Sequence, residues 1–316
     1  MNDLRIVFMG TPNFASNVLE GLIDNGYNIV GVVTQPDKEV GRKKVLTPSP
    51  VKEVALSRGL KVFTPFKIRK EYDDILALNP DLIITCAYGQ IIPKEILDYP
   101  KYKCINTHGS LLPRGRGGAP IQHALIDGDE KTGITLMYMN EKMDEGDILY
   151  QKEIIIDDLD TNTTLFSKLS DLALNMLLEF LPEYFKGNFK ATKQDNALAT
   201  YTYNLTKEDE FISFDDDTKK VYNHIRGLLD NPGAYFVLDN VKYKLIKVHY
   251  ELTNVSEPNT FVGLENNYLR INCKDGFIKV FIIKPEGKNE MDGKSFYNGK
   301  GKSLVGLKPE TVYEKR

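Results

Sequence analysis

The sequence predicts an α/β domain with a mostly parallel sheet, followed by a smaller β domain. Three observations carry this prediction. The 316 residues exceed one small module, the first half alternates short apolar runs with amphipathic segments, and the last third changes to closely spaced short strands. Hydrophobic residues make up 41% and charged residues 27%, which is ordinary globular usage and excludes disordered, collagen-like and coiled-coil chains.

In the first half, runs rich in isoleucine and valine are expected to be strands, with amphipathic helices between them. The expected strands are 5–9, 29–34, 82–87, 103–107 and 134–139. The expected helices are 12–25, 49–58, 68–78 and 119–127. This alternation is typical of a parallel sheet covered by helices.

The strongest helical pattern spans 163–186, where apolar side chains recur at spacings of three and four, as in core packing. Residues 188–206 are polar and are expected to link two domains. A helix at 221–229 and short strands then predict a β-barrel of about five strands. The strands are 235–238, 241–248, 268–273 and 277–283. The expected division is therefore 1–187, a linker at 188–206, and 207–316.

Several classes of protein are not expected. The longest apolar runs are far below the ~20 residues that span a bilayer, and the first residues do not resemble a signal peptide. Three separated cysteines and four histidines offer no disulfide framework and no metal-ligand spacing, so no metal is expected. The turn after the first strand lacks the glycine pattern of a dinucleotide site. We expect a cytoplasmic protein.

The formal net charge of −3 hides two basic segments. Between Lys38 and Lys52, five basic residues against one acid give a net charge of +4, and Lys294–Lys308 contains four lysines and no acid. Either segment alone is more often solvated surface. Two such segments on an acidic chain indicate a polyanion held in a defined place.

Asn106 and His108 are the first candidates for chemistry. They lie two apart at the carboxyl end of an expected parallel strand, so both side chains face the same side at the edge where α/β sheets bind ligands. A glycine- and proline-rich loop follows. A lone histidine at a strand end is often structural, so the pattern leaves both interpretations open.

An acidic turn within 143–149 supplies the second candidate, Asp144. Three acids in four positions can be only a solvated turn. If the fold returns this turn to the same sheet edge, Asp144 can orient His108 and favour its charged form. Without a serine or cysteine the three residues make a poor covalent triad. They suit direct acyl transfer, in which Asn106 and His108 hold the oxyanion and Asp144 helps to remove the amine proton.

These motifs resemble the folate-dependent formyltransferases. The similarity includes Asn-x-His-x-Ser-Leu-Leu-Pro at 106–113, Arg-x-Arg-Gly-x-x-Pro at 114–120 and Asp-x-Gly-Asp-Ile at 144–148. The start at 6–15, the loop 34–52, the segment 87–93 and the C-terminal 225–235 resemble the branch that acts on methionyl-tRNA. The resemblance covers about 1–310, and its most specific motifs lie in 5–150.

The resemblance implies a Rossmann-like catalytic domain and an OB-like barrel that binds tRNA. It implies formyl transfer from 10-formyltetrahydrofolate to the α-amino group of initiator methionyl-tRNA, by a protein that we expect to be a monomer. It places the catalytic roles on Asn106, His108 and Asp144. The folate-binding residues it implies are Ser110, Leu111, Leu112 and Pro113, with Tyr88, Gly89, Gln90 and Ile91. The implied and charge-based tRNA-binding residues are Arg42, Lys43, Lys44, Lys294, Lys300 and Lys302.

The sequence departs from the family pattern at two places. Gly115 stands where many relatives carry a tryptophan, and the usual Asn-Pro-x-Pro-Gly-Ala is shortened at 230–234. Two alternative functions share most of these features. A formyltransferase acting on an amino sugar-nucleotide would keep the three catalytic residues, and a non-catalytic RNA-binding protein would keep the fold and the basic segments.

Overall fold

The computed structural model describes residues 3–41 and 43–315, which form two compact units. The N-terminal unit contains 1–117, 132–154 and 166–202, and the C-terminal unit contains 118–131, 155–165 and 203–316. The expected boundaries treat the domains as contiguous. The interleaving arises because 118–131 and 155–165 pack against a helix of the C-terminal unit. The functional division at 188–206 stays a prediction.

A seven-stranded sheet in the order β10-β9-β7-β6-β1-β2-β5 forms the centre of the N-terminal unit. The five strands from β7 to β5 run parallel, and β9 is antiparallel to β7, so the predicted mostly parallel sheet is confirmed. The strands are β1 (Ile6–Gly10), β2 (Ile29–Val33), β5 (Val62–Phe63), β6 (Leu82–Cys86), β7 (Cys104–His108), β9 (Lys131–Tyr138) and β10 (Ile148–Ile155).

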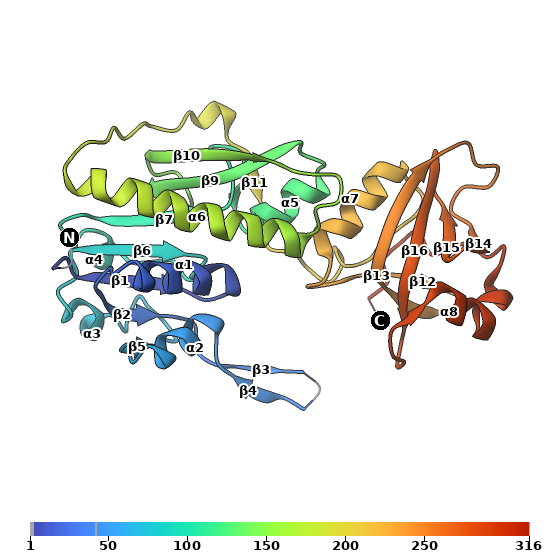
Figure 1. The fold of residues 1–316 in the computed structure, drawn as a ribbon, viewed down its shortest axis with the longest axis horizontal. Helices are drawn as coiled ribbons and strands as arrows, with labels where there is room; N and C mark the ends of the chain where they lie inside the picture. Colours follow the sequence, from blue (N-terminus) through green and yellow to red (C-terminus); the bar gives the residue numbers. More distant parts are fainter. Residues whose placement is uncertain (1–2, 42, 316) are drawn as a thin grey trace. The chain divides into compact units, whose positions relative to one another are not determined.

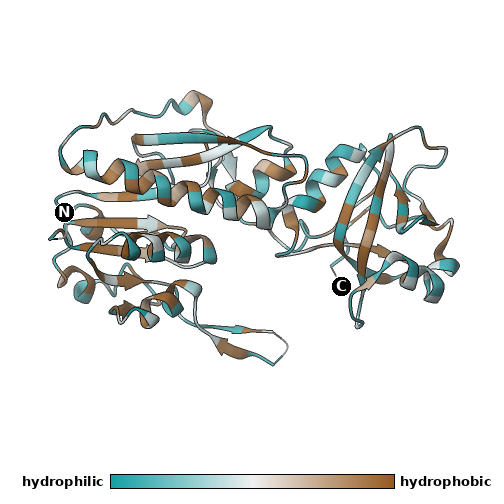
Figure 2. Cartoon of the chain, in the orientation of Figure 1, coloured by the Kyte–Doolittle hydropathy of each residue, from teal (hydrophilic) through white to brown (hydrophobic). Residues whose placement is uncertain are grey.

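Helices cover both faces of this sheet, which explains why strands β1, β2 and β6 are mainly apolar (Figures 1 and 2). Side chains that alternate along β1 face in opposite directions, and Val7 and Met9 pack in a core with residues of α3 and α4. Across the sheet, α1 packs so closely on α6 that a Cβ at Gly21 would lie 2.1 Å from Leu174. The helices are α1 (Asn13–Asp24), α2 (Pro50–Ser57), α3 (Asp73–Leu76), α4 (Lys94–Leu97) and α6 (Asn162–Phe185).

Two small features of this unit were not expected from the sequence. Residues within the basic loop form an exposed hairpin of β3 (Lys38–Val40) and β4 (Val45–Thr47). Part of the polar 188–206 segment returns to the sheet unit, where β11 (Tyr201–Thr202) pairs in parallel with β8 (Arg116–Gly117) after a short η1 helix (Asn196–Leu198). That segment is therefore structured over part of its length.

The C-terminal unit is an antiparallel sheet in the order β12-β13-β16-β15-β14, with β17 beside β16. Helices α7 and α8 pack on this sheet around one apolar core, and the predicted small β domain is confirmed. Helix α5 joins the same unit, since a Cβ at Gly227 of α7 would lie 2.7 Å from Ile126. The strands are β12 (Ala234–Leu238), β13 (Val241–Leu252), β14 (Phe261–Glu265), β15 (Tyr268–Asn272), β16 (Gly276–Pro285) and β17 (Met291–Asp292). The helices are α5 (Pro120–Ile126), α7 (Thr218–Leu228), α8 (Gly293–Gly299) and η2 (Gly301–Leu304).

Every helix among residues 3–41 and 43–315 is too short or too polar to cross a membrane. The same residues contain no group of three histidine, cysteine or acidic side chains placed to bind a metal ion.

Candidate active site at the end of strand β7

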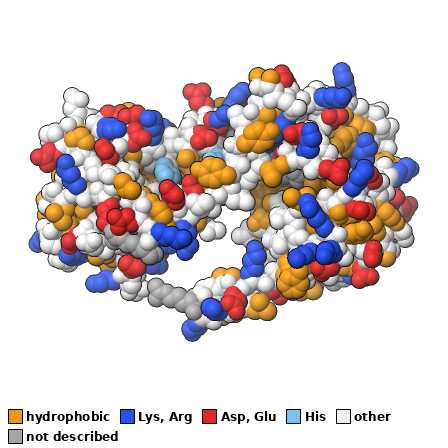
Figure 3. All heavy atoms as spheres, turned by 180° about the vertical axis from the view of Figure 1, so that it is seen from behind, with side chains coloured by type: hydrophobic (Ala, Val, Ile, Leu, Met, Phe, Trp, Pro, Cys, Tyr) orange, Lys and Arg blue, Asp and Glu red, His pale blue; other side chains and the backbone are white. Residues whose placement is uncertain are grey.

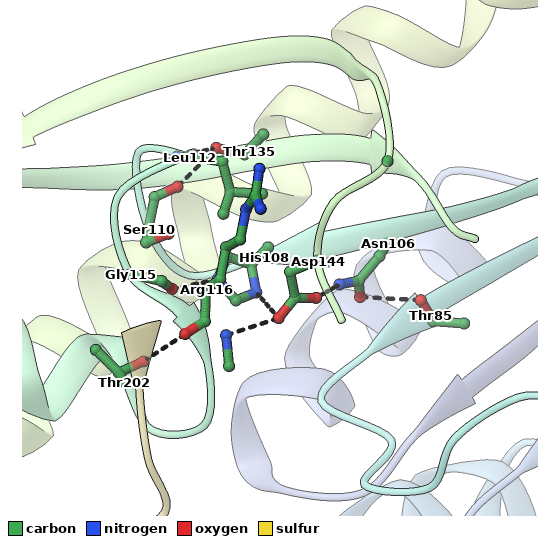
Figure 4. A network of polar contacts seen from close by, with 12 residues as sticks. Thr85, Asn106, His108, Ser110, Leu112, Gly115, Arg116, Thr135, Asp144 and Thr202 are labelled. Carbon is green, nitrogen blue, oxygen red and sulfur yellow. Dashed lines mark hydrogen bonds and ion pairs between the residues drawn. The ribbon is translucent and has the colours of Figure 1, made fainter. Parts of the chain in front are cut away.

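Asn106 and His108 close strand β7 and lie on the same side of the sheet, as strand alternation requires. Asp144 comes from the turn between β9 and β10 and lies between them (Figure 4). Its Oδ2 is 3.7 Å from His108 Nδ1, an ion-pair distance longer than a direct hydrogen bond. Its Oδ1 is 3.5 Å from Asn106 Nδ2. The fold thus brings the three predicted catalytic side chains to one point.

The His108 ring has a fixed orientation. Its Nε2 lies 2.8 Å from the carbonyl oxygen of Gly115. A carbonyl oxygen can only accept, so Nε2 carries a proton, and Nδ1 is the ring atom that faces Asp144. The side chain is only 7% exposed. The second ring nitrogen is therefore the one available for chemistry.

Asn106 and Asp144 are oriented by groups from neighbouring elements. Thr85, the partner of Asn106 in the parallel β6–β7 pair, donates its hydroxyl to Asn106 Oδ1 at 2.9 Å. This contact turns the Asn106 NH₂ group toward Asp144. The backbone N–H of Gly117 donates to Asp144 Oδ2 at 2.9 Å, which holds the carboxylate in place.

Two glycines next to the site allow their backbone segments to pack closely against neighbouring strands. A Cβ at Gly117 would lie 2.4 Å from the Thr202 carbonyl oxygen, and a Cβ at Gly146 would lie 1.7 Å from the Tyr138 carbonyl oxygen. Gly117 also has a φ of 102°, which other residues rarely adopt. Both turns that meet at Asp144 therefore need glycine.

The loop at 110–113 follows the same strand and is tied down from both sides. Thr135 of β9 donates to the Ser110 carbonyl oxygen at 2.6 Å and accepts from the Leu112 N–H at 3.2 Å. Gln151 of β10 donates to the Leu112 carbonyl oxygen at 3.0 Å. Ser110 and Leu112 are buried, whereas Leu111 and Pro113 are half-buried.

The second expected folate segment, 88–91, lies after β6. The Tyr88 side chain points into the core, and burial raises the pKa of its hydroxyl. Gln90 accepts from the Ile68 N–H at 2.9 Å and so supports a neighbouring loop. Gly89 and Ile91 are exposed. Any contact that Tyr88 and Gln90 make with a ligand therefore comes mainly from their backbone.

The six expected tRNA-binding residues are divided between the two units. Arg42 lies outside the described residues. Lys43 and Lys44 are exposed at the tip of the β3–β4 hairpin. Lys294, Lys300 and Lys302 are exposed in the C-terminal unit, and Lys300 forms an ion pair of 3.1 Å with Asp239. Figure 3 shows blue and red side chains mixed over the displayed face of each unit.

Sequence reasoning missed three contributors to the site: Thr85, the backbone of 115–117, and Gln194. Thr85 could have been found from the parallel pairing of the strands at 82–87 and 103–107. No sequence pattern indicates the backbone of 115–117 or Gln194, because their roles depend on where the polar segment after 188 returns to the sheet.

Comparisons with known proteins agree with this geometry. The Formyl transferase family matches residues 4–181, and the Formyl transferase C-terminal domain matches 204–301. A methionyl-tRNA formyltransferase of Bacillus mycoides is 47% identical over 314 residues, which is 97% of each chain.

Two solved structures show the same fold at low identity. A methionyl-tRNA formyltransferase from Clostridium thermocellum gives a TM-score of 0.56 at 22% identity, covering 78% of this chain and 94% of its own. An N-formyltransferase from Helicobacter canadensis, in complex with folinic acid and dTDP-3-aminofucose, gives 0.67 at 20% identity, covering 88% and 98%. Because both domain models match and the Bacillus mycoides relative aligns over 97% of each chain, the chain belongs to the methionyl-tRNA formyltransferase family.

Proposed function

We propose that the chain transfers the formyl group of 10-formyltetrahydrofolate to the α-amino group of methionine on initiator tRNA. The observation that carries this proposal is the convergence of Asn106, His108 and Asp144 at the carboxyl edge of the sheet. Similarity over nearly the full length of the chain to relatives named for this activity supports the choice of reaction. The product is N-formylmethionyl-tRNA, used in translation initiation.

Two N–H donors serve the formyl oxygen, which gains negative charge as the amine attacks the formyl carbon. Asn106 offers Nδ2, because its Oδ1 is already bonded to Thr85. His108 offers Nδ1, because its Nε2 is already bonded to Gly115. The carboxylate of Asp144, 3.7 Å from Nδ1, stabilises a proton on that atom. Fixed donors aimed at a developing charge are the main device of acyl-transfer enzymes.

Asp144 also acts as the general base that accepts the proton lost by the amine. A C–N bond forms between the amine and the formyl carbon, and the bond from that carbon to N10 of the folate breaks. Asp144 accepts the amine proton, and N10 receives a proton as it leaves, so no proton is gained or lost overall. The carboxylate is 17% exposed, which leaves it accessible to an incoming amine.

The folate is assigned to residues 110–113 and 88–91. The 110–113 loop lies between His108 and the Thr135–Gln151 contacts that fix its backbone. Thr11 and Gln35 both donate to the Tyr88 carbonyl oxygen, at 2.9 and 3.1 Å, and hold the start of the second segment. These bonds support a rigid binding surface at the sheet edge. No metal takes part in this proposal.

The acceptor is assigned to the basic segments, with Arg42, Lys43 and Lys44 near the acceptor end and Lys294, Lys300 and Lys302 further along the tRNA. In this proposal the protein acts as a monomer in the cytoplasm. The amino sugar-nucleotide alternative is also tested, because an N-formyltransferase in complex with dTDP-3-aminofucose shares the fold.

The test is a formylation assay with 10-formyltetrahydrofolate as donor. We expect transfer to methionyl initiator tRNA and none to amino sugar-nucleotides. Transfer to a sugar acceptor alone would replace the proposed substrate. Tight tRNA binding without any transfer would instead favour the non-catalytic RNA-binding alternative.

A further inference from the structure

The side chain of Gln194 bridges a buried arginine and the turn that carries Asp144. Its Nε2 donates to the carbonyl oxygens of Asp144 and Gly146, both at 2.8 Å. Its Oε1 accepts from Arg116, from Nη2 at 2.9 Å and from Nε at 3.1 Å. One amide thus makes four hydrogen bonds. No residue of the proposed mechanism other than Asp144 takes part in them.

The turn at Asp144 needs external support. Asp144 has a φ of 52°, in the left-handed region that a non-glycine residue seldom adopts. The two carbonyl groups of 144 and 146 point the same way, toward a single donor group. By joining them, Gln194 fixes the turn in the conformation that aims the Asp144 carboxylate at His108.

Arg116 anchors the other side of this bridge. Its side chain is fully buried, and its guanidinium contacts Asn196 Oδ1 at 2.8 Å and Glu145 Oε1 at 3.6 Å, besides Gln194. The neighbours of Arg116 hold the site directly, because Gly115 accepts from His108 and Gly117 donates to Asp144. The segment 194–202 fastens this stretch through the Thr200 carbonyl oxygen, which accepts from the Arg116 N–H at 2.9 Å.

We propose that Gln194 is a positioning residue for catalysis, which acts by holding the Asp144 turn against His108. The inference rests on the proposed function, because it gives Asp144 a catalytic role. It makes Gln194, but not the whole of the polar segment around it, part of the support of the active site. In this role Gln194 acts through the Asp144 turn and not on a substrate.

The first test replaces Gln194 with methionine, which keeps the length of the side chain and removes all four hydrogen bonds. We expect kcat to fall about 10–100-fold, the scale of a small misplacement of a reacting group, with both KM values nearly unchanged. Gln194→Glu keeps an acceptor for Arg116 but loses both donors, so it should not restore kcat. Recovery of wild-type turnover by the glutamate would overturn the proposal, because contact with Arg116 alone would then suffice.

Asn196→Ala is the matched control. Asn196 is exposed, lies in the same segment and also accepts from Arg116, but it does not contact the Asp144 turn. Its kcat should stay within about twofold of the wild type, as for a substitution away from the bridge. A loss equal to that of Gln194→Met would overturn the proposal, because anchoring of Arg116 would then explain both.

A double-mutant cycle with Asp144→Asn separates positioning from general stability. If Gln194 acts through the Asp144 carboxylate, Gln194→Met should lower kcat much less in the Asp144→Asn background. Equal losses in both backgrounds would overturn the inference while leaving the proposed function intact. An inactive wild type would overturn the proposed function itself. If Gln194→Met does not fold, Gln194→Asn, which is one methylene too short to reach both carbonyls, replaces it in the cycle.

Discussion

His108 is the residue whose chemistry is most constrained by its contacts. Both of its ring nitrogens have assigned partners, Gly115 at Nε2 and Asp144 at Nδ1. We expect His108→Ala to lower kcat about 10²–10³-fold, the loss that follows removal of one oxyanion donor. Folate binding should persist, since the 110–113 loop is held by Thr135 and Gln151.

Single-turnover formylation and folate titration would measure these two effects. His123→Ala is the matched control, because His123 is also buried and bonded to a carbonyl oxygen, that of Tyr203, yet lies in the C-terminal unit. Wild-type turnover in His108→Ala would remove His108 from the mechanism.

Thr85 offers a test of how Asn106 is oriented. Thr85→Val keeps the shape and removes the hydroxyl that donates to Asn106 Oδ1, so the amide is free to rotate. We expect kcat to fall about fivefold, in line with one hydrogen bond of about 1 kcal/mol. Steady-state kinetics with both substrates would show it as a change in kcat rather than in KM.

Thr107→Val is the control for that substitution. Thr107 is buried on β7 next to Asn106, but its hydroxyl has no hydrogen-bond partner among residues 3–41 and 43–315, and its side chain faces away from that of Asn106. Its replacement should leave kcat unchanged and not lower stability. Equal kinetic effects at the two positions would mean that loss of any buried hydroxyl from strands β6 and β7, not of the Thr85–Asn106 contact, lowers the rate.

The residues that the sequence could identify are those whose placement follows from strand alternation. Asn106 and His108 face the same side because they are two apart on β7, and Asp144 follows from a turn at the end of β9. Gln194 could not be identified. The role of Gln194 depends on the packing of a polar segment against Arg116, which lies far away in the sequence, and no local sequence pattern indicates that packing.

At the scale of elements, the long helix and the apolar strands were predicted well, and one short helix was predicted poorly. The helix expected at 163–186 is α6, Asn162–Phe185. The helix expected at 68–78 is reduced to α3, Asp73–Leu76, and that prediction was wrong over its first turns. Glu71 and Gln90 accept from the backbone N–H groups of 66–68, and these bonds hold the preceding chain as a loop.

Helix α7 contains a group that makes stability depend on pH. His224 is partly buried and bonded to the Asp209 carbonyl oxygen at 2.8 Å, and burial lowers the pKa of its ring. The unfolded chain therefore binds a proton at higher pH than the folded chain does. The stability that neutral His224 contributes is complete above about pH 6.5 and is lost as the pH falls below that value.

His224→Gln removes this titration while keeping an N–H donor for Asp209. We expect its Tm to fall less than that of the wild type between pH 7.5 and 5.5, with the two proteins compared at pH 8 as a baseline. Thermal unfolding followed by circular dichroism would measure the difference. Parallel Tm curves would assign the acid sensitivity to other groups.

At the scale of the whole molecule, the sequence predicted two domains but not their interleaving. Segments 118–131 and 155–165 join the C-terminal unit because they pack on α7, where Arg226 donates to the carbonyl oxygens of Asp157 and Asp160. These contacts link residues more than sixty positions apart. The hydrophobic pattern of each segment fits a contiguous first domain equally well, so only tertiary packing decides.

The two basic segments lie in different units, Lys43 and Lys44 in one and Lys300 and Lys302 in the other. If both contact one tRNA, binding releases counterions, and log K should fall by roughly 0.9 per log unit of salt for each duplex phosphate neutralised. Lys300→Ala with Lys302→Ala should flatten this slope by about one to two such units while kcat stays nearly unchanged.

Arg42→Ala should behave differently from the lysine pair. If its loop positions the methionyl end, losing the arginine disturbs the geometry of attack as well as binding, so kcat should fall too. Salt titrations of tRNA binding and single-turnover rates on both variants would separate the effects, with Lys94→Ala and Lys101→Ala, two exposed lysines of the N-terminal unit outside both segments, as a charge-matched control. A salt-independent affinity for the acceptor, or unchanged kinetics in Arg42→Ala, would mean that these segments are ordinary solvated surface and that tRNA is not the acceptor.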